Sequence, residues 1–152
     1  MAVTATDERW LAEAIELSRR CPPSATAFSV GAVVVGADGA VLSTGYSREL
    51  EPADHAEEVA LRRIGQDAAF SLAGATLYSS LEPCAMRKSR PVPCAQLIIA
   101  GGIGRVVIAW QEPPLFVPGG GSRVLADAGV AVDVIAGLAE QARAVNAHLL
   151  TG

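Results

Sequence analysis

Apolar residues recur every three or four positions near the start of the chain, over residues 6–20. They are Trp10, Leu11, Ala14, Ile15 and Leu17. This spacing places one apolar stripe along a helix and predicts that the segment is amphipathic. Asp7 and Glu8 favour the start of the helix through their negative charge, and Pro22 prevents it from continuing. The first element is therefore expected to pack one face on a core.

Shorter runs rich in valine, isoleucine and other apolar residues predict β-strands. Residues 28–35 and 40–45 flank the segment Gly36-Ala37-Asp38-Gly39, which is typical of a hairpin turn. Further strands are expected over residues 76–81, 105–110 and 130–135. The pattern therefore predicts five strands, of which the first two are antiparallel.

Helices are expected between and after these strands. They cover residues 55–64, 93–102, 121–128 and 138–150. Asp54 is placed to cap the first of them, and Gly101 and Gly102 are placed to end the second. Because a helix separates the last two strands, these strands should run parallel. The sequence therefore predicts one α/β domain over residues 1–152, with a mixed five-stranded sheet between two helical layers.

The composition narrows the class of protein. Hydrophobic residues make up 51% of the 152 residues and charged residues only 18%, which argues against disorder. A net charge of −4 and a pI of about 5.1 argue against a nucleic-acid partner. The sequence has no run of 18 apolar residues and no basic, then apolar, export pattern at its start. We therefore expect a soluble cytoplasmic protein that does not bind membranes.

One histidine, one glutamate and two cysteines form the pattern with the clearest chemistry. His55 and Glu57 lie two residues apart, Cys84 follows Pro83, and nine residues separate Cys84 from Cys94. Imidazole and thiolate groups bind zinc, and three protein ligands leave the fourth tetrahedral position open for water. Because a structural site would close all four positions, we interpret His55, Cys84 and Cys94 as a catalytic site for one zinc ion. Glu57 is then placed to move protons.

The three ligands all fall at or just before an expected helix start. The partial positive charge of a helix N-terminus favours a thiolate over a thiol, so this placement suits a metal site. The alternatives are a helix-capping role for His55 and a buried thiol for Cys94. Cys21 is interpreted as an ordinary free thiol.

These residues resemble the signature of the zinc-dependent nucleobase and nucleoside deaminases, H-x-E followed by P-C-x-x-C. The longer spacer between the cysteines is typical of one branch, the pyrimidine deaminase of riboflavin biosynthesis. Segments similar to that branch are residues 30–35, 81–84, 90–95, 100–107 and 125–130. The resemblance implies a cytidine-deaminase-like fold and attack of zinc-bound hydroxide on an amidine-like ring carbon, with release of ammonia. It also implies that Glu57 is a proton shuttle and not a ligand.

The spacer between the cysteines carries three cations, Arg87, Lys88 and Arg90. In the riboflavin branch a similar loop, with an arginine at the place of Arg90, helps to bind a ribose phosphate. The resemblance therefore implies that these cations hold a phosphate through charge-assisted hydrogen bonds. The alternative is a solvated basic loop, or one that pairs with acidic residues of a neighbouring subunit.

Aromatic residues near the expected pocket depart from the riboflavin branch, which has Pro-Asn-Pro before its valine-glycine strand. Here Phe28 precedes Ser29-Val30-Gly31, which is similar to free cytidine deaminases whose phenylalanine lines the pocket. An ordinary core position is the alternative for Phe28. Trp110 and Phe116 are further candidates for walls around an aromatic base.

Acidic residues give two more candidate substrate contacts. Glu112 follows the fourth strand, where the riboflavin branch has an acidic residue, but the asparagine found nearby in that branch is missing here. Glu82 precedes Pro83, and a hydrogen bond to nearby backbone is favoured over substrate contact for its carboxylate. Glu58 is expected to face solvent or to pair with Arg62.

Three classes of function stay open. The favoured one is a deaminase of a small aminopyrimidine, either the riboflavin-pathway diaminopyrimidine nucleotide or a cytosine-type base or nucleoside. A deaminase of bases within nucleic acid must accept single strands, which the acidic charge disfavours. A zinc-stabilised binding protein would have no use for Glu57. By analogy with the family we expect a homodimer or larger homo-oligomer. Because the sequence ends at Gly152, we expect it to lack the reductase domain that often follows this deaminase.

Overall fold

A five-stranded sheet forms the centre of the protein, which we describe over residues 2–65 and 72–150 from a computed structural model. The strands lie in the order β2-β1-β3-β4-β5. Their bounds are Gly31–Val35 for β1, Val41–Tyr46 for β2, Thr76–Ser79 for β3, Arg105–Ile108 for β4 and Ala131–Val134 for β5. β1 pairs antiparallel with β2 and β3, whereas β3, β4 and β5 are parallel. The predicted mixed sheet, with its last two strands parallel, is confirmed.

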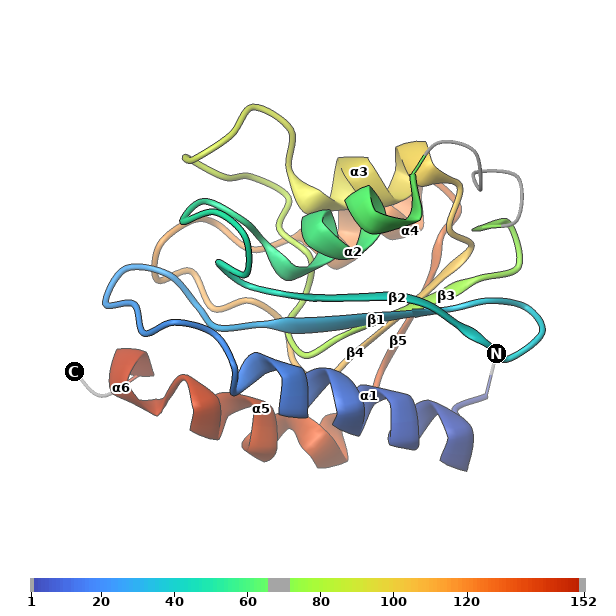
Figure 1. The fold of residues 1–152 in the computed structure, drawn as a ribbon, viewed down its shortest axis with the longest axis horizontal. Helices are drawn as coiled ribbons and strands as arrows, with labels where there is room; N and C mark the ends of the chain where they lie inside the picture. The colour runs from blue at the N-terminus through green and yellow to red at the C-terminus, as the bar shows by residue number, and fades with distance from the viewer. Residues whose placement is uncertain (1, 66–71, 151–152) are drawn as a thin grey trace.

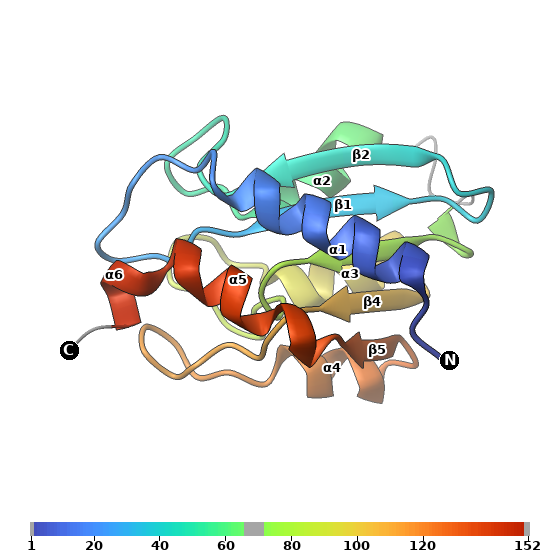
Figure 2. The same cartoon turned by 90° about the horizontal axis from the view of Figure 1, so that it is seen from below.

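Helices cover both faces of this sheet, as Figure 1 shows. One face carries α2 (Ala56–Ile64), α3 (Cys94–Gly101) and α4 (Gly121–Asp127). The other carries α1 (Ala5–Ser18), the short 3-10 turn η2 (Ala136–Leu138), α5 (Ala139–Val145) and α6 (Ala147–Leu150). In Figure 2, α1 and α5 lie side by side across the strands. The predicted three-layer α/β/α architecture is confirmed, and no helix among the described residues is long and apolar enough to cross a membrane.

The structure differs from the predicted helices in two places. Asp54 does not cap α2, because its carboxylate accepts hydrogen bonds from the backbone of Leu50 and Glu51, and His55 is the N-cap residue instead. The predicted continuous helix over 138–150 is interrupted between α5 and α6 at Asn146. The side chain of Asn146 is buried and bonds both the N–H and the carbonyl of Ser29, so a tertiary contact overrides the helical pattern.

Two glycines let helices lie directly on the hairpin. A Cβ on Gly31 would stand 1.9 Å from the carbonyl oxygen of Ala14 in α1, and one on Gly45 would stand 2.5 Å from that of Ala56 in α2. Only glycine fits at such distances. Because Ala56 is the residue between His55 and Glu57, this close approach fixes the start of α2 against β2.

A buried ion pair joins α1 to the middle of the sheet. Arg105 of β4 donates from Nη1 and Nη2 to the two carboxylate oxygens of Asp7, at 2.9 and 3.1 Å. The hydroxyl of Tyr78 donates to the same carboxylate at 2.6 Å, and Arg105 Nε donates to Asp133 of β5. The Arg105 guanidinium holds the pKa of Asp7 well below its ordinary value. The pair therefore contributes stability that depends on the Asp7 charge.

We expect Asp7→Ala to lower the free energy of unfolding at neutral pH by about 3–5 kcal/mol, because it leaves the Arg105 charge buried and less well paired. The pKa of Asp7 is lower in the folded state, so its contribution is complete above the unfolded pKa of about 4 and is lost as pH falls below that value. Urea unfolding between pH 7 and pH 3 measures both effects. Asp7→Ala should flatten the acid loss seen in the wild type, and the exposed Asp127→Ala should not. Identical acid profiles for wild type and Asp7→Ala would contradict this role.

Candidate active site

Three soft ligand atoms meet where α2 and α3 begin. The Nδ1 atom of His55 lies 3.6 Å from the Sγ atom of Cys84 and 3.4 Å from that of Cys94, and all three atoms are within 4.8 Å of one another. Zinc bonds of about 2.3 Å to sulfur and about 2.0–2.1 Å to nitrogen, at tetrahedral angles, imply a separation of about 3.6 Å. The three side chains therefore fit a zinc ion and leave one position without a protein ligand from the described residues.

Two helix starts and one loop bring these ligands together. His55 is the N-cap of α2 and Cys94 is the first residue of α3, as predicted. Cys84 does not begin a helix, which corrects the prediction, because it lies in the loop that follows β3. The helical N–H of Cys94 instead donates to Cys84 Sγ at 3.2 Å, so the start of α3 stabilises both sulfur atoms.

Of the two cysteine thiols, one ionises more easily than both together. Hydrogen bonds from the Cys94 thiol and from His55 lower the pKa of Cys84 to about 4. The hydrogen bond between the two cysteines raises the pKa of Cys94, and the burial of Cys94 raises it further. A bound cation reverses the second effect, because metal binding favours the deprotonated ligand. The ligand set is therefore suited to a divalent cation that neutralises two thiolates.

Glu57 stands beside the ligands and lines the same cavity. Only 4% of the residue is exposed, and burial raises the pKa of its carboxyl group. One carboxylate oxygen, Oε1, lies 2.6 Å from the hydroxyl of Ser79 at the end of β3. A carboxyl group with this environment holds a proton more readily near neutral pH than an exposed glutamate does, as a proton shuttle requires.

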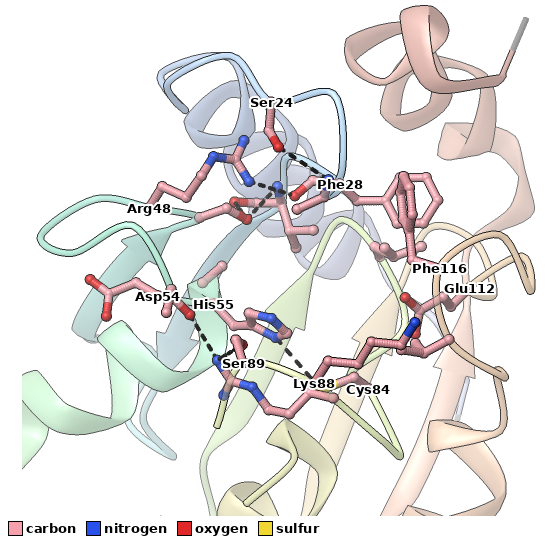
Figure 3. A pocket seen from close by; sticks show the side chains of 18 of the residues that line it. Ser24, Phe28, Arg48, Asp54, His55, Cys84, Lys88, Ser89, Glu112 and Phe116 are labelled. Atoms are coloured by element: carbon pink, nitrogen blue, oxygen red, sulfur yellow. Dashed lines mark hydrogen bonds between the residues drawn. The ribbon is translucent and has the colours of Figure 1, made fainter. Parts of the chain in front are cut away.

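A cavity of about 400 Å³ is lined by two of the three ligands, His55 and Cys84, and by Glu57. Its walls include the loop 24–28, the segment after β2 and the spacer between the two cysteines. Figure 3 shows Phe28 and Phe116 beside each other at one side of this cavity, with His55 and Cys84 at another. The two rings stand edge to face, with their centroids 5.2 Å apart. The cavity is of the size and character that hold small ligands.

Comparisons with known proteins agree with this geometry. Residues 4–110 match the model of the cytidine and deoxycytidylate deaminase zinc-binding region. The chain belongs to this deaminase family. The family resemblance predicted from the sequence, and zinc as the metal of the site, are thereby confirmed.

Individual relatives point to one branch of the family. The diaminohydroxyphosphoribosylamino-pyrimidine deaminase of Schizosaccharomyces pombe is 40% identical over 126 residues, which are 82% of this chain and 31% of that protein. The riboflavin biosynthesis protein RibD of Escherichia coli is 40% identical over 131 residues, or 83% of this chain and 33% of that protein. The chain thus spans about a third of the length of these curated relatives.

Solved structures share the fold over nearly the whole chain. The Rib2 deaminase of Aspergillus oryzae in complex with DARIPP has a TM-score of 0.79 and 28% identity, covering 93% of this chain and 90% of that one. Acinetobacter baumannii RibD has a TM-score of 0.76 and 32% identity, covering 95% and 39%. The dCMP deaminase of cyanophage S-TIM5 is only 24% identical, with a TM-score of 0.62, and shows the fold alone.

Of the three aromatic residues predicted to form pocket walls, Phe28 and Phe116 line the cavity and Trp110 does not. Trp110 is 6% exposed and packs behind Phe28, with the ring centroids 5.9 Å apart. The guanidinium carbon of Arg143 in α5 lies 5.4 Å from the Trp110 ring centroid. The prediction that Trp110 contacts substrate was therefore wrong, because its side chain is directed into the core beneath the pocket wall.

The two predicted acidic contacts differ in what their carboxylates do. Both oxygens of Glu82 accept backbone hydrogen bonds, from Glu112 at 3.0 Å and from Ser122 at 2.9 Å. Glu82 therefore holds the loop after β4 through hydrogen bonds to backbone, which was the interpretation favoured from the sequence. Burial raises the pKa of Glu112 to about 8, and its Oε1 atom is buried without a hydrogen-bond partner in the described part of the chain. Glu112 lines the cavity, so its carboxyl group is available to bind a ligand there.

The three cations of the spacer also separate into different roles. Arg90 does not line the cavity and instead forms ion pairs with Glu58 at 2.8 Å, Asp54 at 3.2 Å and Glu51. Arg87 lines the cavity, but its Nη2 atom bonds Glu58 and the carbonyl of Ala53. Acidic residues of the same chain thus hold the guanidinium of Arg90, and its predicted contact with phosphate stays a prediction.

Lys88 is the remaining cation of the spacer. It is exposed, lines the cavity and makes no ion pair with any residue that the structure describes. Glu58 pairs with Arg62, which was one of the two expected outcomes, and it also pairs with Arg87 and Arg90. Within the spacer, the structure thus leaves one unpaired positive charge at the mouth of the cavity.

Sequence reasoning missed the residues that hold the pocket wall. Arg48 has a left-handed backbone, with φ at 59°, and donates from Nη1 to the carbonyl of Phe28 and from Nη2 to Ser29. Asn146 bonds the backbone of Ser29 from the opposite side. No local pattern indicates either contact, because one partner lies in a turn and the other interrupts a predicted helix.

Proposed function

We propose that residues 1–152 form a deaminase domain that uses zinc to hydrolyse an aminopyrimidine. The observation that carries this proposal is that a buried carboxyl group, Glu57, lines the same cavity as His55 and Cys84, two members of the three-ligand set that Cys94 completes. A zinc site that serves structure alone needs neither a cavity nor a proton carrier beside the metal. A non-catalytic zinc protein is therefore the weaker alternative.

The reaction replaces a ring C–NH₂ group by C=O, using one water molecule and releasing one ammonia molecule. Zinc, when bound, supplies a Lewis acid that makes water nucleophilic at neutral pH. Glu57 accepts one proton from the attacking water and passes it to the ring nitrogen. It then carries the second proton, from the new hydroxyl group on the ring carbon, to the departing amine. Phe28 and Phe116 provide apolar surfaces against which a flat ring can lie.

For the substrate we propose a diaminopyrimidine that carries a phosphorylated ribosyl group. Support comes from the S. pombe relative, whose name describes such a compound, and from the A. oryzae Rib2 structure in complex with DARIPP. Glu112, with its raised pKa, can present a carboxyl proton to the ring, and Lys88 offers a positive charge to a phosphate. A cytosine-type base or nucleoside is the alternative, since Arg90 is withdrawn into ion pairs.

A homodimer or larger homo-oligomer is also part of this proposal. Leu50 and Met86 are 59% and 56% exposed, and both lie in loops that border the cavity. Large exposed apolar side chains of this kind suit contact with a second copy of the chain. A cytoplasmic location remains a prediction, which the need for two reduced thiols as ligands supports.

Glu57→Gln tests the proposed chemistry, because glutamine keeps the size of the side chain and cannot shuttle protons. We expect the rate of ammonia release to fall by at least about 100-fold, as removal of a general acid–base group predicts, with one zinc ion per chain retained. Zinc content by metal analysis and ammonia release by a coupled assay measure the two properties. Full activity of the Glu57→Gln protein would contradict the proposed role.

Lys88 and Arg90 form a matched pair for testing how a phosphate is held. Lys88→Ala should raise KM for a phosphorylated substrate about 10- to 100-fold, because one charge-assisted hydrogen bond to the phosphate is lost. KM for the unphosphorylated form of the substrate should stay within about twofold of the wild-type value. Arg90→Ala should instead lower the melting temperature, because it breaks the pairs to Glu58 and Asp54. Steady-state kinetics on both substrates would reject the assignment if Arg90→Ala, and not Lys88→Ala, showed the phosphate-specific change.

A further inference from the structure

Ser79, the last residue of β3, is the hydrogen-bonding partner of the Glu57 carboxyl group. Its side chain is fully buried, and its Oγ atom lies 2.6 Å from Glu57 Oε1 and 2.7 Å from the carbonyl oxygen of Leu81. Ser79 pairs with Ala32 of β1 on one side and with Ile108 of β4 on the other. The hydroxyl is therefore carried by a strand fixed on both sides.

The hydroxyl of Ser79 has one hydrogen and cannot donate to both of its partners at once. In one arrangement it donates to Glu57 Oε1. In the other it donates to the carbonyl of Leu81 and accepts a hydrogen bond from the O–H of the protonated Glu57 carboxyl group. Either arrangement keeps a hydrogen bond at Oε1, so the side chain of Glu57 is held in one place.

This hydrogen bond distinguishes the two carboxylate oxygens of Glu57. Oε1 is bound to Ser79, whereas no other described residue gives Oε2 a side-chain or backbone partner. The oxygen without a partner is then the one available to carry protons in the cavity. A misplacement of about 1 Å at a reacting group costs on the order of 100-fold in rate, so the anchor matters to the chemistry.

We propose that Ser79 is a positioning residue that holds Glu57 Oε1 and thereby presents Oε2 to the reacting atoms. This inference rests on the proposed function and extends it to a residue outside the zinc-ligand pattern. Ser80 supplies a matched control, since it is the next residue and is equally buried. Its hydroxyl accepts the backbone N–H of Gly31 at 3.0 Å and does not bond Glu57.

The test compares Ser79→Ala, Ser79→Thr and Ser80→Ala in the zinc-loaded protein, with zinc content and melting temperature recorded for each. Ser79→Ala should lower kcat about 10- to 100-fold, with KM within about threefold and zinc retained. Ser79→Thr keeps a hydroxyl, so if Ser79→Ala lowers kcat 100-fold, the kcat of Ser79→Thr should be at least about tenfold higher than that of Ser79→Ala. Ser80→Ala should lower the melting temperature and leave kcat within about threefold.

Crystal structures of the wild type and Ser79→Ala give a readout that does not depend on turnover. The Glu57 carboxylate should be displaced or should occupy several rotamers in Ser79→Ala. An unmoved carboxylate, an unchanged kcat or an equal kcat loss in Ser80→Ala would overturn the positioning role. A wild-type protein that binds zinc and turns over no aminopyrimidine would instead refute the proposed function, and the structures would still decide what Ser79 does.

Discussion

Two thiols and an imidazole share a space less than 5 Å across, and this arrangement needs a cation to be stable in its functional form. Without one, a single negative charge is held mainly by Cys84, and burial opposes a second charge on Cys94. The rest of the structure serves to make this convergence possible. Gly45 admits α2 against β2, which places His55, and the start of α3 supplies an N–H to the sulfur of Cys84.

The charged residues around the site are used mainly to hold its loops. Glu51, Asp54 and Glu58 are paired with Arg62, Arg87 and Arg90, so three negative and three positive charges join the loop before α2 to the spacer between the cysteines. Arg90, which three carboxylates hold, has little left to offer a substrate. Lys88 and Glu112 line the cavity and form no ion pair with a residue that the structure describes, and substrate selection is expected to depend on them.

The sequence was informative where function depends on residue type at a fixed spacing. His55, Glu57, Cys84 and Cys94 could be chosen from the chain alone, because imidazole, carboxylate and thiolate groups at those intervals have few structural uses. The strands and most helices followed from apolar periodicity. Helix ends were predicted less well. The carboxylate of Asp54, for example, could accept hydrogen bonds either from the first turn of α2 or from the backbone of the loop before it, and it accepts them from the loop.

Tertiary contacts account for what the sequence did not reveal. Arg90 has the residue type expected of a phosphate ligand, yet its partners come from an acidic segment more than 30 residues earlier. Trp110 has a side chain suited to a pocket wall, but it is buried in the core, where Arg143 of α5 lies against its ring. Ser79 reads as one polar residue in a buried strand, and only the folded structure shows that it touches Glu57.

The central claim is that the zinc set and Glu57 act together on an aminopyrimidine, and ammonia release by the zinc-loaded protein tests it most directly. The substrates to compare are the diaminopyrimidine ribosyl phosphate, its unphosphorylated form, cytosine, cytidine and deoxycytidylate. The account predicts turnover of the diaminopyrimidine nucleotide that ceases when zinc is removed and returns when it is restored. Turnover that persists in fully metal-free protein, or no turnover of any of these compounds with zinc bound, would contradict it.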